Sequence, residues 1–225
     1  MAGLIRCVLM IVMVAVLAVP CLAASKARIS PLSKGFGSVT WGEDVSKRKD
    51  FLKLRSDDGV DYFVSLRETY DMQGYGKPTV FYGQSGGRLY AAHLRLKEDA
   101  SYDKLAAELS RLYGPGKKMR EGDTAVMRWK TGPVRVKLKK DPAGGVKLSF
   151  YYQPVAVTLS MIQREAEPVS DELTRLLPSG DTPMTVPAGA LPPKQEDYVG
   201  IDVLKYLREG SQLLKLDLPK TRPAQ

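Results

Sequence analysis

Residues 124–152, TAVMRWKTGPVRVKLKKDPAGGVKLSFYY, contain three runs of alternating side chains separated by two short turns rich in Gly and Pro. In the middle run, three apolar residues alternate with three basic residues. Because successive side chains of a strand point to opposite faces, this pattern is typical of a strand with one apolar and one basic face. The stretch therefore predicts a three-stranded antiparallel meander whose apolar face packs on a core.

Two hairpins and one helix are predicted upstream of the meander. Alternation on both sides of an Asp-Gly pair indicates a hairpin over residues 51–66, and a second hairpin is expected over residues 78–96. Residues 101–114 carry apolar side chains at helical spacing, with Ser101 as N-cap and Gly114 at the C-terminal end. The predicted fold class is therefore α+β, with an antiparallel sheet of hairpins and a three-stranded meander packed on one main helix.

The pattern along the chain predicts four parts. These are a signal peptide (1–23), an α+β domain (36–162), a Pro-rich linker (163–197) and a C-terminal amphipathic helix (198–216). Within the domain, VAVTL at residues 155–159 is expected to extend the sheet. The apolar stripe of the C-terminal helix consists of Val199, Val203, Tyr206, Leu207 and Leu214. This stripe either folds back onto the domain or docks on a partner or a membrane surface.

The N-terminus has the features of a secretory signal peptide. Arg6 is the only charge before a long apolar run, and small residues surround a cleavage position after Ala23. The expected location is therefore the periplasm or the exterior, and an uncleaved membrane anchor is the alternative. Lipidation at Cys21 is disfavoured by the preceding Pro20. Cleavage removes both cysteines of the chain, Cys7 and Cys21, which excludes disulfides, thiol nucleophiles and thiolate metal sites from the mature protein.

The chain is strongly basic, with a formal net charge of +9 over its 225 residues. Such a charge favours anionic partners and carries no information about the fold. Outside the cytoplasm the expected partners are an acidic protein, an anionic lipid or an envelope polymer, and nucleic acid is not expected. Most of the excess lies in the meander, where we predict an anion-binding face formed by Arg128, Lys130, Arg135, Lys137 and Lys139. The alternative is a solvated face whose lysines block edge pairing.

Catalytic and metal-binding patterns are scarce, and no cofactor, catalytic residue or metal ligand is predicted. His93 is the only histidine, and we interpret it as an ordinary strand residue. A triad with Ser85 or Ser149 would lack the Gly-x-Ser-x-Gly elbow around its nucleophile. SDDGVD, residues 56–61, fits a hairpin turn better than a calcium loop.

Paired carboxylates are the remaining route to catalysis. Glu43, Asp44 and Glu68 are the candidates, because two convergent carboxyl groups can hydrolyse a glycosidic bond. The sequence does not show that any two of them converge.

Four short segments resemble a family of small, exported, largely uncharacterised proteins of Gram-negative bacteria. They are GSVTWG (37–42), VFYGQSGGRLYAAHL (80–94), LYG (112–114) and MRWKTGPVRVKL (127–138). The resemblance covers about residues 36–152 and implies a compact α+β domain behind a signal peptide. It implies no activity and no catalytic residues.

The sequence thus favours an exported, non-enzymatic envelope protein that binds an acidic partner or an anionic surface. One alternative is a carboxylate-based hydrolase of an envelope polymer. The other is an assembly or structural component recruited through residues 198–216.

Overall fold

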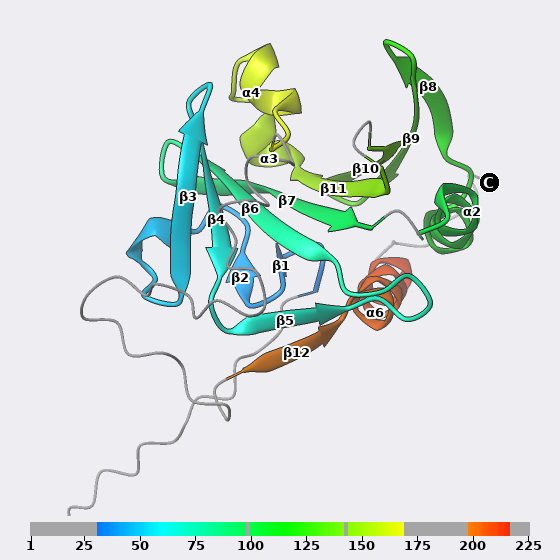
Figure 1. Ribbon diagram of the computed structural model, residues 1–225, viewed down its shortest axis with the longest axis horizontal. Coiled ribbons are helices and arrows are strands. Elements are labelled where there is room, and N and C mark those ends of the chain that lie inside the picture. The colour runs from blue at the N-terminus through cyan, green and yellow to red at the C-terminus, as the bar shows by residue number, and fades with distance from the viewer. Residues whose placement is uncertain (1–30, 98–99, 142–143, 169–197, 217–225) are drawn as a thin grey trace, which may run out of the picture.

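An eight-stranded antiparallel sheet forms the centre of the molecule, as Figure 1 shows. The computed structural model describes residues 31–97, 100–141, 144–168 and 198–216. The sheet has the order β3-β4-β6-β7-β11-β10-β9-β8. Its strands are β3 (Phe51–Asp57), β4 (Val60–Ser65), β6 (Thr79–Ser85), β7 (Arg88–Leu96), β8 (Lys117–Glu121), β9 (Thr124–Thr131), β10 (Val134–Lys140) and β11 (Val146–Tyr152). The predicted α+β class with an antiparallel sheet is confirmed, although strands predominate.

The sheet consists of two four-stranded halves that meet at their last strands. β7 pairs with β11 in antiparallel fashion, which places His93 opposite Ser149. Both predicted hairpins and the predicted meander are present. At the first hairpin, Asp58 and Gly59 have φ values of +49° and +76°. This left-handed pair is the geometry that the Asp-Gly turn favours.

One face of the sheet carries the larger apolar core. It is covered by α2 (Tyr102–Tyr113), α6 (Val203–Leu216), η1 (Val45–Lys47) and the pair β1 (Gly35–Phe36) and β2 (Val39–Thr40). The Ser101 side chain accepts a hydrogen bond from the amide of Lys104, and Gly114 ends the helix with a φ of +85°. Leu105 and Leu109 of α2 are fully buried. The predicted caps and apolar face of this helix are therefore present.

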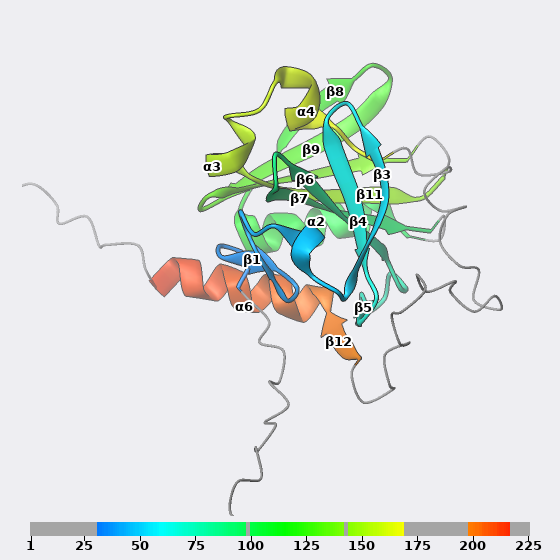
Figure 2. The same cartoon turned by 90° about the vertical axis from the view of Figure 1, so that its left-hand side faces the viewer.

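The C-terminal segment returns to this same face. Residues Val199–Asp202 form β12, which pairs in parallel with β5 (Glu68–Asp71), and α6 begins only at Val203. The predicted helix over 198–216 is therefore wrong for its first residues. Figure 2 shows α6 lying along the domain beside β1.

The apolar stripe of this segment packs on its own domain. Val203 and Leu207 are fully buried, and the Tyr206 hydroxyl donates to the Gly35 carbonyl at 2.7 Å. The side chain of Leu214 lies outside the described part of the chain. The stripe thus folds back onto the domain, one of the two predicted arrangements.

The opposite face of the sheet is covered by two short helices, α3 (Gln153–Ala156) and α4 (Met161–Glu165). The predicted strand over residues 155–159 is wrong. Pro154 lies in the first turn of α3, where its missing N–H costs nothing, whereas a strand would lose a ladder hydrogen bond there.

The predicted domain boundary at residue 162 also falls inside α4. Packed structure continues to Pro168, and residues 1–23 and 169–197 of the predicted signal peptide and linker lie outside the described residues. Within 31–97, 100–141, 144–168 and 198–216, every helix is too short or too polar to cross a membrane.

Candidate anion-binding site

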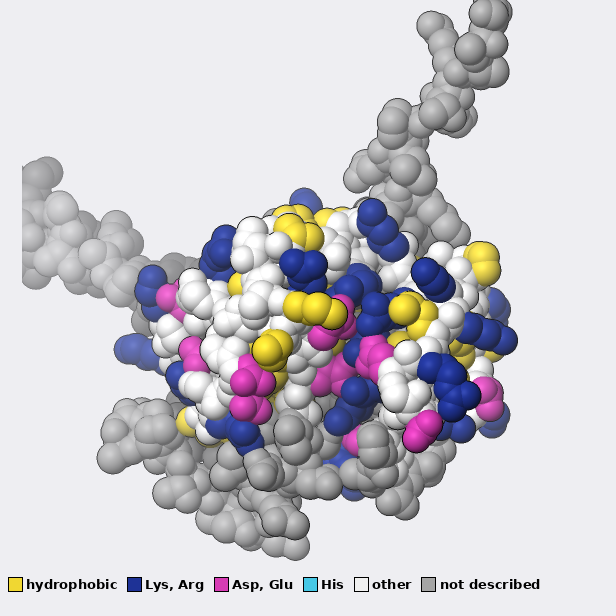
Figure 3. Space-filling view, turned by 90° about the horizontal axis from the view of Figure 1, so that it is seen from above, with side chains coloured by type: hydrophobic (Ala, Val, Ile, Leu, Met, Phe, Trp, Pro, Cys, Tyr) yellow, Lys and Arg dark blue, Asp and Glu magenta, His cyan; other side chains and the backbone are white. Residues whose placement is uncertain are grey.

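The predicted basic residues lie together on the face of the sheet that α3 and α4 cover. Lys137 of β10 lies directly between Arg128 of β9 and Ser149 of β11, and Arg135 lies opposite Lys130. We call Arg128, Lys130, Arg135, Lys137 and Lys139 the basic face. Figure 3 looks onto this side of the molecule, where dark blue cationic and magenta acidic side chains gather near the middle of the view.

The expectation that this face points into solvent is wrong for most of it. Lys137 is only 2% exposed, and only Lys130 of the five is exposed to solvent rather than buried or half-buried. The chain brings its own carboxylates to the face: Glu121 from β8, Glu165 from α4 and Glu167 just after α4. The basic residues therefore bind anionic groups of their own chain before they meet any other ligand.

Glu165 and Glu167 pair with four of the five residues of the basic face. The Glu165 carboxylate lies 3.2 Å from Arg128 Nη2 and 2.8 Å from Arg135 Nη2. Glu167 lies 2.7 Å from Lys137 Nζ and also pairs with Lys139. The like-charged neighbours on β9 and β10 are thus separated by carboxylates, which removes much of their mutual repulsion.

Glu121 completes the network from the edge strand. Its carboxylate bridges Arg128 Nη2 and Lys137 Nζ, each at 2.7 Å. Burial opposes ionisation of this carboxyl group, but the Lys137 ammonium group and Arg128 together lower its pKa.

The Glu167 carboxylate is the most strongly held. Although burial opposes its ionisation, the ammonium groups of Lys137 and Lys139 lower its pKa to about 2. The Tyr151 hydroxyl lies 3.3 Å from Glu167 Oε1 and donates to it. The carboxylate is therefore charged at any physiological pH.

One part of the basic face remains open as a groove of about 590 Å³. We call it the anion groove, because its lining includes four cationic residues, Lys117, Arg128, Lys130 and Arg135. The remaining lining residues are Tyr113, Pro115, Trp129, Gln153 and Val157. Trp129 Nε1 donates to the Gly114 carbonyl at 3.1 Å, which fixes the indole beside the groove.

The cations of the anion groove are only partly neutralised. Lys117 and Lys130 are exposed, and neither has a carboxylate partner among the described residues. Arg128 Nε and Arg135 Nε are buried donors without an acceptor in the described part of the chain. A buried donor without an acceptor is costly, but these two atoms are closed to solvent, so a ligand in the groove meets the exposed ammonium groups of Lys117 and Lys130 first.

Sequence reasoning missed Lys117, Glu165 and Glu167. β8 is missing from the sequence prediction because its residues, KKMRE, include a single apolar side chain, Met119, and show no alternation. The two glutamates had been assigned to the linker. Ser160 and Gln163 form a capping box at α4, and this Ser-x-x-Gln pattern is a sequence signature that indicates the helix.

His93 lies deep beneath the same face. Its Nδ1 is 3.0 Å from Ser149 Oγ, both side chains are buried, and the rings of Tyr62 and Tyr151 flank the imidazole. Burial lowers the pKa of His93 to about 3, so the ring is neutral. The contact with Ser149 therefore lacks the solvent access that a nucleophile and base require.

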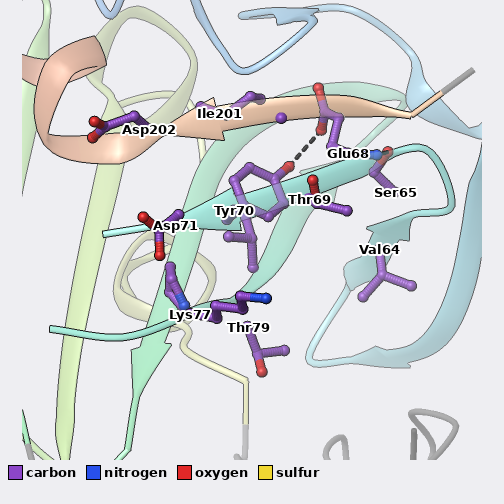
Figure 4. Close-up of a pocket in the computed structure, with 13 residues that line it drawn as sticks. Val64, Ser65, Glu68, Thr69, Tyr70, Asp71, Lys77, Thr79, Ile201 and Asp202 are labelled. Atoms are coloured by element: carbon purple, nitrogen blue, oxygen red, sulfur yellow. Dashed lines mark hydrogen bonds between the residues drawn. The ribbon is translucent and has the colours of Figure 1, made fainter. Parts of the chain in front are cut away.

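The carboxylate candidates occupy other places. Glu43 accepts from the Thr40 amide, and Asp44 caps η1 while accepting from Gln84. Glu68 is buried and lines a second pocket of about 620 Å³ (Figure 4). Its carboxylate accepts from Tyr70, from Tyr82 at 2.6 Å and from the Ser38 amide at 2.6 Å. These donors occupy the Glu68 carboxylate, which acts as a structural link.

Two further acidic residues line the second pocket, Asp71 and Asp202. Asp202 accepts a hydrogen bond from the Lys205 amide and so caps α6. Asp71 is therefore the one carboxylate of this pocket that has no partner in the described residues. Hydrolysis by paired carboxylates needs two free groups, and this pocket does not favour it. Across the described residues no cluster of three His, Cys, Asp or Glu could hold a metal ion.

Comparison with known proteins found no family model, no curated protein and no solved structure that matches this chain. The resemblance to exported Gram-negative proteins therefore remains a prediction.

Proposed function

We propose that the protein is an exported, non-enzymatic envelope protein that binds an anionic group in the anion groove. The observation that carries this proposal is the convergence of four cationic side chains on one open groove, two of them without a carboxylate partner in the described part of the chain. The two arginines supply planar donors for anionic oxygens, and the two lysines supply mobile point charges.

The electrostatics of the groove favour oxygen anions over neutral ligands. Its four cations are opposed by Glu121 and Glu165, so a positive excess remains. Because Lys117 and Lys130 are exposed, salt screens their part of the attraction over about 8 Å at physiological ionic strength. Affinity should therefore fall steeply as salt is added.

Export belongs to the same proposal. It is supported by the apolar N-terminal segment with a single early charge and small residues near position 23. In the cell envelope the available anionic groups are lipid phosphates, acidic polymers and acidic proteins.

The test is titration of the protein with tripolyphosphate, a small soluble polyanion, by calorimetry. Lys117→Glu with Lys130→Glu should weaken binding roughly tenfold or more, because two attractive charges become repulsive. Lys104→Glu with Lys118→Glu is the matched control. Both controls are exposed, and Lys118 follows Lys117 on the same strand with its side chain on the opposite face. Equal weakening by both double variants would defeat the proposal, since the effect would then be one of net charge alone.

A further inference from the structure

The end of α3 and the start of α4 carry apolar side chains that the fold leaves in solvent. Val157 is 56% exposed, Met161 82% and Ile162 67%. Single exposed apolar residues are common on protein surfaces, but three within six positions form a patch. We call Val157, Met161 and Ile162 the apolar ridge.

The backbone beneath the apolar ridge is firmly held. The Arg164 guanidinium donates to the carbonyls of Ala156, Val157 and Leu159 at 3.1–3.3 Å. The Tyr90 hydroxyl donates to the Gln163 carbonyl at 2.6 Å, and the capping box fixes the start of α4. The ridge is therefore a preformed projection, because its exposed side chains stand on a backbone with many fixed contacts.

The apolar ridge adjoins the anion groove. Val157 belongs to the ridge and also lines the groove. Glu165, at the end of α4, pairs with two groove residues, Arg128 and Arg135. In Figure 1, α3, α4 and the β8–β9 hairpin rise on the same side of the sheet. One surface thus presents a rigid apolar projection beside a cluster of cations.

We propose that this surface binds peripherally to a bilayer containing anionic lipids. The headgroup phosphates would meet the anion groove, and Met161 and Ile162 would enter the boundary between headgroups and acyl chains. The inference rests on the proposed function and names the source of the anionic group. A soluble polymer offers charge alone, whereas a bilayer interface offers charge and an apolar layer within about 5–10 Å.

The two contacts are expected to act together. Neither a few lysines nor two inserted side chains anchor a protein stably, and stable membrane binding generally needs two such contributions. Loss of either contact should therefore remove most of the binding to vesicles. Each apolar side chain kept out of the bilayer should cost about tenfold in affinity.

The experiment measures co-sedimentation with vesicles of phosphatidylcholine, with and without phosphatidylglycerol. The protein is purified in the form that the cell exports, and the tripolyphosphate titration is run in parallel. Met161→Ser with Ile162→Ser removes the apolar side chains without adding charge, and should lower affinity for the mixed vesicles by at least about tenfold and leave tripolyphosphate affinity unchanged. Both residues are exposed, so the variant should fold, which thermal unfolding verifies. Tyr198→Ser, at a position 46% exposed and outside the ridge, is the matched control and should bind like the wild type.

The outcomes separate the two proposals. Binding of the ridge variant to vesicles at the wild-type level overturns the membrane inference and leaves the anion groove standing. Binding of tripolyphosphate without binding of vesicles also overturns it and points to a soluble acidic partner. Failure of the wild type to bind either ligand defeats the proposed function itself.

Discussion

The Lys137 ammonium group lies 2.7 Å from Glu167 Oε1, and both side chains are almost fully buried, with 3% and 9% exposure. Lys137 comes from the middle of the sheet, whereas Glu167 follows α4, thirty residues later in the chain. Both charges of such a buried pair have lost their contact with water. Replacing one partner therefore leaves the other as an uncompensated buried charge, which is strongly destabilising. This pair fastens the α4 segment onto the basic face.

Replacement of Glu167 should therefore destabilise the fold more than replacement of its neighbour. We expect Glu167→Gln to lower the free energy of unfolding by about 3 kcal/mol, because Lys137 then keeps Glu121 and only a long 3.8 Å contact with Glu165, and Lys139 loses its pair with Glu167. Because the Glu165 side chain is 31% exposed, Glu165→Gln should lower the free energy of unfolding by about 1 kcal/mol or less. Chemical denaturation of both variants checks this. Equal losses would contradict a special role for the buried pair.

The same carboxylate should make stability depend on acid pH. The pKa of Glu167 is about 2 in the folded protein and about 4.3 in an unfolded chain. Its contribution is therefore complete above about pH 4.3 and is lost as the pH falls toward 2. Unfolding free energies measured across that interval should fall by up to about 1.4 kcal/mol per pH unit from this group. Glu167→Gln should show a shallower curve, and an unchanged curve would contradict the prediction.

His93 should act in a higher pH interval. Its pKa is lowered to about 3 by burial, against about 6.5 in an unfolded chain, so the unfolded state binds the proton first. Stability should therefore be complete above about pH 6.5 and decline as the pH falls toward 3. His93→Asn keeps a partner for Ser149 without a titrating ring, and should flatten this part of the curve. A curve identical to that of the wild type between these values would show that the imidazole does not contribute.

The C-terminal helix should contribute to the stability of the domain. Leu207 of α6 is fully buried against the domain, and we expect Leu207→Ala to cost about 2–5 kcal/mol of unfolding free energy through lost contacts and a cavity. Lys205→Ala, exposed on the same helix, is the control and should change stability by less than about 0.5 kcal/mol. Thermal or chemical unfolding measures both. If Leu207→Ala had no effect, α6 would be free to detach, and recruitment of a partner through residues 198–216 would gain support.

The elements that sequence patterns predicted are those whose cause is local. The hairpins, the meander and α2 follow from alternation, turn residues and caps within a few positions of each other. α3 was missed because VAVTL has the composition of a strand, and the neighbouring Pro154 decided otherwise. The first residues of the C-terminal segment formed β12 because the edge of β5 offered hydrogen-bonding partners, which helical periodicity does not reveal.

Sequence patterns predicted the basic residues of the site but not their carboxylate partners, for a similar reason. Alternation correctly placed five basic residues on one face, since that depends on the strand alone. Their neutralisation by Glu165 and Glu167 depends on where α4 packs, a long-range contact that no local pattern encodes. The same limit applies to the anion groove, where β8 brings Lys117 opposite Arg128.

Glu165 should compete with external ligands for the anion groove. Its carboxylate pairs with Arg128 and Arg135, the two guanidinium groups that line the groove. Glu165→Gln should therefore raise affinity for tripolyphosphate, by roughly fivefold, because Arg135 loses its pair with Glu165, Arg128 keeps only its pair with Glu121, and one repulsive charge disappears. Glu209→Gln removes an equal charge from an exposed position on α6 and should leave affinity nearly unchanged. If Glu165→Gln weakened binding instead, the carboxylate would serve to orient the arginines, and the groove would be preorganised by the same residue that partly neutralises it.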